Sequence, residues 1–179
     1  MSNVFSIAPT TIAAALVVGI AQSAMAEEPS IQTQGAIIHL ADNLQEEANL
    51  GWCIDTDGRE FTELLHAHSC KPSGDDVLFS YASDTGMIAS ATYENKCMAY
   101  NAPENTVNPF GLVDCDDSAS DQKFVYDDET MEMRLGTDAT QCLTVSSVID
   151  EAGPFQSRDL ILASCSSLET SFKQWVVRG

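Results

Sequence analysis

The chain has 179 residues, a length that suits one domain with a short tail. Its 27 acidic and 8 basic residues give a formal net charge of −19 at pH 7. Nucleic acid is excluded as a partner, because its binding requires lysine and arginine to displace counterions from phosphates, and anionic membrane surfaces are disfavoured for the same reason.

The N-terminal residues have the features of a secretory signal peptide. Residues 11–21 form an uncharged apolar run, and residues 24–26 (Ala-Met-Ala) make a cleavage site of the A-x-A type. The run is shorter than the about 20 residues that a membrane span needs, although a retained N-terminal anchor is the alternative. We expect a signal peptide over 1–26, an N-terminal tail over 27–34 and one domain over 35–179. The protein is then secreted or periplasmic, with no membrane insertion after signal cleavage.

Twelve short strand candidates follow, four in each of three units, and turn-rich segments separate them. Almost no helical periodicity is present, so the chain is predicted to be all-β. The candidates cover 36–40, 52–56, 64–70 and 77–82 in the first unit, 87–90, 97–100, 112–115 and 123–127 in the second, and 131–135, 142–145, 160–165 and 174–177 in the third. Three four-stranded units suit a closed barrel, which leaves no exposed sheet edge.

Six cysteines mark the same three units. Each unit has a first cysteine, a second cysteine 17, 18 or 23 residues later, and an aromatic residue nine or ten residues after that. An even number of cysteines in an exported chain implies disulfides, and a repeat with a period near 45 residues pairs the two cysteines of each unit. The three sets are Cys53, Cys70 and Phe79; Cys97, Cys115 and Phe124; and Cys142, Cys165 and Trp175.

The order of these markers resembles the repeat signature of the ricin-B-type lectins. That signature is a cysteine followed by an apolar residue, then a second cysteine, then an aromatic in a Gln-x-Trp-like motif. The likeness covers about residues 35–178, and the motif stands as Val77-Leu78-Phe79, Gln122-Lys123-Phe124 and Lys173-Gln174-Trp175. The resemblance implies a β-trefoil, in which three four-stranded repeats are related by pseudo-threefold symmetry and each contains one disulfide.

The predicted disulfides also suggest a strand register. If Cys53 lies directly opposite Cys70, antiparallel pairing places Asp55 directly opposite His68. Because side chains alternate between the two faces of a strand, Asp55 and His68 would share one face as direct cross-strand neighbours. The equivalent pairs in the other units are Ala99 with Val113 and Thr144 with Ala163.

The resemblance also places a sugar site. A sugar presents adjacent hydroxyls, which a carboxylate can accept in pairs, and an apolar C–H face, which a flat ring can cover. The resemblance implies that Asp55, His68 and Asp76 bind the sugar, with His68 in the position of the family's usual aromatic ring. The other units lack both the aspartate and the ring, so at most one sugar site is expected, in the first repeat. Nearby carboxylates are expected to favour the charged form of His68, which predicts pH-dependent binding.

Purely structural roles compete with this interpretation. Residues 55–58 (Asp-Thr-Asp-Gly) also make an ordinary turn sequence, and His68 would equally serve as a surface imidazole. His66 and His68 share a strand face as two zinc ligands could, but no further ligands stand at suitable spacing, so we expect no metal and no cofactor.

Catalysis finds no support, since hydrolase, zinc-protease and P-loop motifs are absent from the sequence. We expect a non-catalytic, lectin-like module whose partner is a carbohydrate or glycoconjugate. The alternative is a trefoil whose sugar sites have lapsed and which binds a protein partner, as a toxin-associated or other accessory subunit would.

Overall fold

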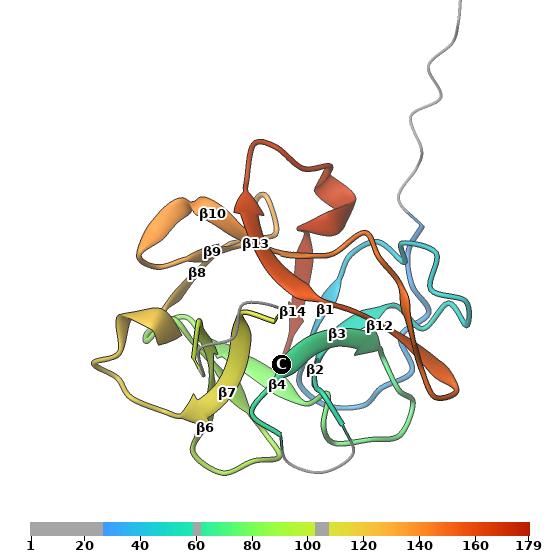
Figure 1. The fold of residues 1–179 in the computed structure, drawn as a ribbon, viewed down its shortest axis with the longest axis horizontal. Helices are drawn as coiled ribbons and strands as arrows, with labels where there is room; N and C mark the ends of the chain where they lie inside the picture. The colour runs from blue at the N-terminus through green and yellow to red at the C-terminus, as the bar shows by residue number, and fades with distance from the viewer. Residues whose placement is uncertain (1–26, 59–61, 103–107) are drawn as a thin grey trace, which may run out of the picture.

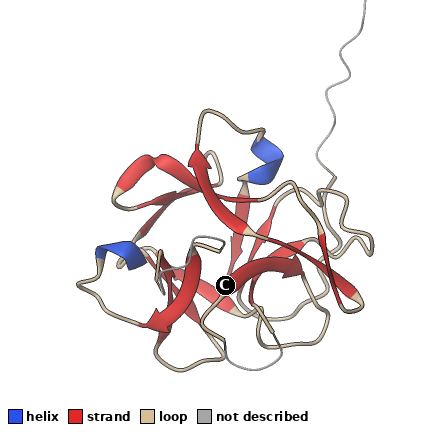
Figure 2. Ribbon diagram, in the orientation of Figure 1, coloured by secondary structure: helices blue, strands red, loops and turns tan. Residues whose placement is uncertain are grey.

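The computed structural model describes residues 27–58, 62–102 and 108–179. The predicted signal peptide over 1–26 lies outside the described residues. The described parts consist mainly of strands. They also contain two short 3-10 helices, η1 (Ser120–Gln122) and η2 (Thr170–Phe172) (Figure 2). No helix in these parts is long and apolar enough to cross a membrane.

Twelve of the fourteen described strands are the predicted ones, four to a unit. The first unit contains β1 (Ile37–Leu40), β2 (Trp52–Thr56), β3 (Leu65–Ser69) and β4 (Phe79–Ala82). The second contains β5 (Met87–Ser90), β6 (Lys96–Tyr100), β7 (Phe110–Asp114) and β8 (Phe124–Asp127). The third contains β9 (Glu132–Leu135), β10 (Asp138–Val145), β13 (Leu160–Ser164) and β14 (Trp175–Arg178). The remaining two, β11 (Asp150–Ala152) and β12 (Phe155–Arg158), form an unpredicted hairpin between β10 and β13.

The three units close on one another around a barrel, and Figure 1 shows them as three sectors. The last strand of each unit pairs with the first strand of the next, β4 with β5 and β8 with β9, and β14 returns to β1. Each unit's last strand begins with its marker aromatic, the aromatic residue that follows the second cysteine. The backbone N–H of this aromatic donates to the carbonyl of the residue that precedes the first strand of the unit. These bonds run from Phe79 to the Ala36 carbonyl (3.1 Å), from Phe124 to Gly86 (2.7 Å) and from Trp175 to Met131 (2.7 Å). Six strands therefore form a closed ring with threefold pseudosymmetry.

The marker aromatics fill the centre of this barrel. Phe79, Phe124 and Trp175 are fully or almost fully buried in one hydrophobic cluster, together with Trp52 and Phe110. Burial of one such side chain stabilises the fold by roughly 1.5–3 kcal/mol. The prediction that these aromatics form the core is confirmed.

One disulfide links the two cysteines of every unit, as predicted: Cys53–Cys70, Cys97–Cys115 and Cys142–Cys165. Each bridge ties the second strand of its unit to the residue just after the third strand.

The hairpin β11–β12 breaks the symmetry. β12 pairs with β3 of the first unit, with Ser157 opposite His68 and Arg158 opposite Ala67. The sheet of the first unit thereby gains two strands, in the order β11-β12-β3-β2-β1-β14, whereas the other two sheets have four strands each. In Figure 1, β12 lies beside β3. The third repeat therefore contributes structure at the strand that carries His66 and His68.

The predicted tail over 27–34 contains no strand but is bonded to the domain. The Asn43 N–H donates to the Glu27 carbonyl (2.6 Å) and the Ser30 N–H donates to the Asn49 carbonyl (2.8 Å). The Thr33 hydroxyl donates to the Lys71 carbonyl (2.7 Å). These bonds fasten the segment to the first unit.

Candidate functional site

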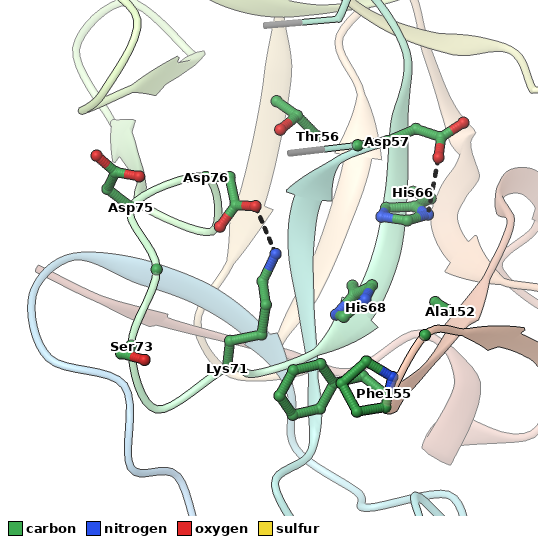
Figure 3. A pocket seen from close by; sticks show the side chains of 14 residues that line it. Thr56, Asp57, His66, His68, Lys71, Ser73, Asp75, Asp76, Ala152 and Phe155 are labelled. Carbon is green, nitrogen blue, oxygen red and sulfur yellow. Dashed lines mark hydrogen bonds and ion pairs between the residues drawn. The ribbon is translucent and has the colours of Figure 1, made fainter. Parts of the chain in front are cut away.

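A pocket of about 530 Å³ opens at the first repeat. Four segments line it: the end of β2 with residues 57 and 58, the β3 residues His66 and His68, the stretch 71–76, and residues 152–155 of the third repeat's hairpin. Figure 3 shows their side chains around the opening. We call this the first-repeat pocket.

An ion-paired triad of Asp55, Lys71 and Asp76 lies at the pocket, and its last two members line it. The Lys71 ammonium lies 2.7 Å from a carboxylate oxygen of Asp55 and 2.5 Å from one of Asp76 (Figure 3 shows the second pair). The Asp55 side chain is completely buried, while that of Asp76 is 13% exposed. Asp55 therefore lies behind Lys71 and does not line the pocket itself, whereas Asp76 does.

Burial makes Asp55 a weak acid. It raises the pKa of this carboxyl to about 7, against the opposing effect of the Lys71 ammonium, and the Asp76 charge adds to the rise. Burial would lower the pKa of Lys71, but the two carboxylates raise it above its ordinary value. Lys71 is therefore charged at neutral pH, and its charge is neutralised locally.

The predicted register between β2 and β3 is wrong by two residues. His66, not His68, lies directly opposite Asp55, and His68 lies opposite Cys53. The reason is that the disulfide joins residues two positions out of register, since the Cys70 N–H donates to the Gly51 carbonyl (2.9 Å). The other units show the same shift: Cys97 lies opposite Val113, and Cys142 lies opposite Ala163.

A shift of two residues preserves the face of a strand, because side chains alternate with a period of two. Asp55 and His68 therefore remain on one face, as diagonal neighbours, with 3.7 Å between His68 Nδ1 and an Asp55 oxygen. The structure thus brings together the three predicted site residues Asp55, His68 and Asp76, with Lys71 between the two carboxylates.

The predicted charge of His68 is wrong. Burial lowers its pKa more than its hydrogen bond to the Ser69 carbonyl (3.0 Å) and the nearby acids raise it. Burial and, to a smaller extent, the neighbouring His68 lower the pKa of His66 to about 4, although Asp57 lies 3.9 Å away. Both imidazoles are neutral at pH 7 and offer hydrogen-bonding nitrogens, not positive charge, to the pocket.

Among the pocket residues that sequence reasoning missed, Lys71 and Phe155 matter most for the proposed site. Lys71 directly follows Cys70 and carried no motif. Phe155 belongs to the hairpin β11–β12, and its ring centroid lies 5.6 Å from that of His68 at an interplanar angle of 64°. The longer cysteine spacing of the third unit was the available signal for an inserted element.

One group of potential metal ligands occurs among the described residues: Glu132, Cys142 and Cys165. The two sulfurs are joined in a disulfide, so they have no thiolate to offer a metal. Glu132 is instead paired with Lys173 (2.8 Å) and Arg134 (2.7 Å).

Comparison with solved structures identifies the architecture. A non-toxic homologue of type II RIPs from bitter gourd, solved in complex with α-methyl-D-galactoside, matches with a TM-score of 0.55 and 14% identity over 79% of this chain and 46% of its own. A mosquitocidal holotoxin matches with a TM-score of 0.55 and 11% identity over 82% of this chain and 17% of its own. This chain has the ricin-B-type β-trefoil fold.

A third similar structure is GalNAc-T7 with UDP, GalNAc and Mn²⁺. It matches with a TM-score of 0.54 and 15% identity over 84% of the present chain and 23% of the GalNAc-T7 chain. The present chain therefore spans less than half the length of each of these three proteins. No protein-family model matches the chain, and no curated protein matches it in sequence. The predicted fold is confirmed, and at this low identity the likeness concerns the fold alone.

Proposed function

We propose that the chain is an exported, non-catalytic carbohydrate-binding module that binds one sugar or glycoconjugate in the first-repeat pocket. The observation that carries the proposal is the composition of that pocket. One open cavity of sugar size brings together the Asp76 carboxylate, the two neutral imidazoles of His66 and His68, and the half-buried ring of Phe155. Hydroxyls need such acceptors and donors, and the C–H face of a sugar needs such a ring.

Two further points support the proposal. The bitter gourd protein of the same fold was solved with a galactoside. Three disulfides, with no free cysteine among the described residues, suit a protein that works in an oxidising compartment outside the cytoplasm.

Within this proposal, the three predicted residues have different roles. Asp76 and His68 line the pocket and contact the sugar directly. Asp55 is a positioning residue, since it is buried and acts through the Lys71 ammonium, 2.7 Å away. Lys71, fixed between two carboxylates, donates hydrogen bonds to sugar oxygens without adding net charge.

A glycan array tests the proposed function. The mature chain, residues 27–179, is expected to give a signal on a defined set of glycans, and Asp76→Asn is expected to abolish it while the unfolding midpoint in urea changes little. Thr130→Ala, far from the pocket in sequence, is the control and keeps the signal. A wild-type protein that binds no glycan on the array contradicts the proposal.

One observation favours a second candidate function, a trefoil that binds a protein partner and has lost sugar binding. Lys71 covers Asp55, the residue that the resemblance assigns to the sugar hydroxyls, so this carboxylate is closed to solvent. Asp55→Asn and Lys71→Met separate the two candidates. If the pocket binds sugar, wild type binds a glycan and both variants change its affinity; if the trefoil has lost sugar binding, wild type binds no glycan and both variants change stability alone.

A further inference from the structure

The first-repeat pocket is built by two repeats. The connection between β10 and β13, residues 146–159, is longer than the corresponding connections 57–64 and 101–109 of the other units. Its hairpin reaches the first unit because β12 pairs with β3, where Ser157 lies opposite His68. The turn of this hairpin, residues 152–155, forms one wall of the pocket. The residues of that wall belong to the third repeat, so the sequence motifs of the first repeat do not predict them.

The two walls differ in polarity. The hairpin contributes apolar side chains, Ala152, Pro154 and Phe155, whereas the other lining segments contribute the carboxylates of Asp57 and Asp76. Figure 3 shows Phe155 beside His68, with Asp57 and Asp76 away from it. The ring of Phe155 meets His68 in an edge contact and is only partly buried. A ligand with one apolar face and one hydroxyl-bearing edge matches this division, and a pyranose ring has both.

The charges of the pocket further restrict the ligand. Lys71 is the cation that lines the pocket among the described residues, and both of its neighbours at ion-pair distance are carboxylates. Asp57 and Asp75 add negative charge at the rim, and the imidazoles add no positive charge at neutral pH. A carboxylated or sulfated sugar would meet an uncompensated negative field. A neutral sugar meets no such penalty.

We propose that Phe155, supplied by the third repeat, is the ring on which a neutral pyranose stacks in the first-repeat pocket. This inference rests on the proposed carbohydrate-binding function and specifies both its ligand class and its apolar contact. His68, in the position of the family's usual ring, makes an edge contact with Phe155; its Nδ1–H donates to the Ser69 carbonyl, so its Nε2 accepts a hydrogen bond from a sugar hydroxyl. Stacking buries the C–H face of the sugar against the ring and orients its hydroxyls toward Asp76.

Three substitutions at Phe155 test the stacking role. The strongest neutral glycan from the array is titrated by calorimetry into wild type, Phe155→Trp, Phe155→Leu and Phe155→Ala. Trp keeps a flat face and is expected to hold the affinity within about threefold of wild type. Leu keeps apolar bulk without a flat face, so both Leu and Ala are expected to lose at least about tenfold, equivalent to about 1.4 kcal/mol. Val148→Ala, an exposed position in the same connection, is the matched control and binds like wild type.

The outcomes distinguish this inference from the proposed function. If wild type binds a neutral glycan, Asp76→Asn loses it and Phe155→Leu binds unchanged, then the sugar site stands and Phe155 is not its platform. A wild type that prefers sialylated or sulfated glycans on the array overturns the neutral ligand class. A wild type that binds no glycan overturns the proposed function and this inference with it. Urea unfolding of each variant shows that its fold is intact before its affinity is compared.

Discussion

Lys71 pairs with a buried carboxylate, Asp55, and burial makes the ionisation of this carboxylate unfavourable. Asp55 has one oxygen 2.7 Å from the ammonium, while its other oxygen has no hydrogen-bond partner among the described residues. Breaking a buried pair by removing one partner destabilises a protein strongly, since it leaves an uncompensated charge. Asp55 can escape that cost by binding a proton, because its pKa is already about 7. The cost of losing Lys71 must therefore depend on pH.

We predict that Lys71→Met destabilises the protein at high pH and much less at low pH. An unfolded aspartate ionises near 3.8, and the folded one near 7, so folding favours bound proton and stability is lost as pH rises between these values. Without the ammonium the folded pKa rises further, and the loss extends above pH 7. Urea titrations should find the variant close to wild type at pH 5 and lower in unfolding free energy by about 3 kcal/mol at pH 9.

Lys123→Met is the control for this prediction, because its partner Asp117 is exposed and 4.0 Å away. It should cost less than about 1 kcal/mol at both pH values. An equal loss for Lys71→Met at pH 5 and pH 9 would show that Asp55 does not change protonation.

For single residues, the sequence predicted which strand face a side chain lies on better than it predicted which residue lies opposite. Asp55 and His68 were correctly placed on one face, because the alternation of side chains survives a two-residue error in register. Their direct opposition was wrong, since a disulfide does not require its cysteines to be directly paired residues. Lys71 could not be anticipated, because its role depends on the conformation of 71–76, which brings its ammonium to both Asp76 and the β2 residue Asp55.

Among the elements, the two departures from threefold symmetry are packed on each other. The connection between β1 and β2, residues 41–51, is longer than the corresponding connections 91–95 and 136–137, and we call its residues 41–49 the insertion. It lies against the hairpin β11–β12 through Arg158, whose guanidinium donates to the carbonyls of Leu44 and Ser146 (both 2.8 Å). The same guanidinium lies 4.6 Å from the centre of the Trp52 ring. The Ser69 hydroxyl adds a hydrogen bond to Glu46 in that insertion (2.7 Å). The insertion therefore supports the hairpin that carries Phe155.

We predict that Arg158→Met lowers the unfolding free energy by about 2–3 kcal/mol, since it leaves two carbonyls without their charged donor. Arg134→Met is the matched control: its partner Asp127 is partly exposed and Glu132 keeps its ion pair with Lys173, so the loss should stay within about 1 kcal/mol. Urea unfolding of both variants measures the difference. Equal, small losses would mean that the insertion and the hairpin are stable independently of each other.

A second prediction at this scale concerns the disulfides. Replacing both Cys97 and Cys115 with alanine removes a crosslink over 18 residues. We expect a loss of about 3 kcal/mol in unfolding free energy, because the unfolded chain regains the entropy of an open loop. Denaturation with and without reductant checks this: wild type should become less stable in reductant, whereas the variant should change by a smaller amount. A variant as stable as wild type would contradict a structural role for this bridge.

The elements that could be predicted are those marked by local sequence. Short apolar runs beside a cysteine or a marker aromatic located nine of the twelve strands, and short apolar runs between turn-rich segments located the other three, because such runs fill a core wherever the units are placed. β11 and β12 carry polar sequences, Asp-Glu-Ala and Phe-Gln-Ser-Arg, without an apolar alternation. They are strands because β12 pairs with the edge of β3, and no local sequence pattern encodes this contact between repeats.

At the scale of the whole molecule, the threefold arrangement was predictable because one spacing recurs three times, while the placement of the pocket was not. Repetition fixes how many units there are and that they must bury a common core. The pocket depends on what differs between the units: the longer connection in the third, and the Asp55, His68 and Asp76 set of the first. Differences between repeats therefore carry the candidate function, and repetition carries the fold.

The charge of the whole molecule leads to a last prediction. The net charge of −19 falls entirely on residues after position 26, and the compact fold holds these charges closer together than the unfolded chain does. Salt screens such repulsion over about 10 Å at 0.1 M, so sodium chloride should stabilise the folded state. We expect the thermal midpoint at pH 7 to rise by several degrees between 10 mM and 500 mM salt. Near pH 4.1, the isoelectric point of the sequence, the same series should change it little. An equal rise at both pH values would assign the effect to salt acting on apolar burial, not to the charge of this protein.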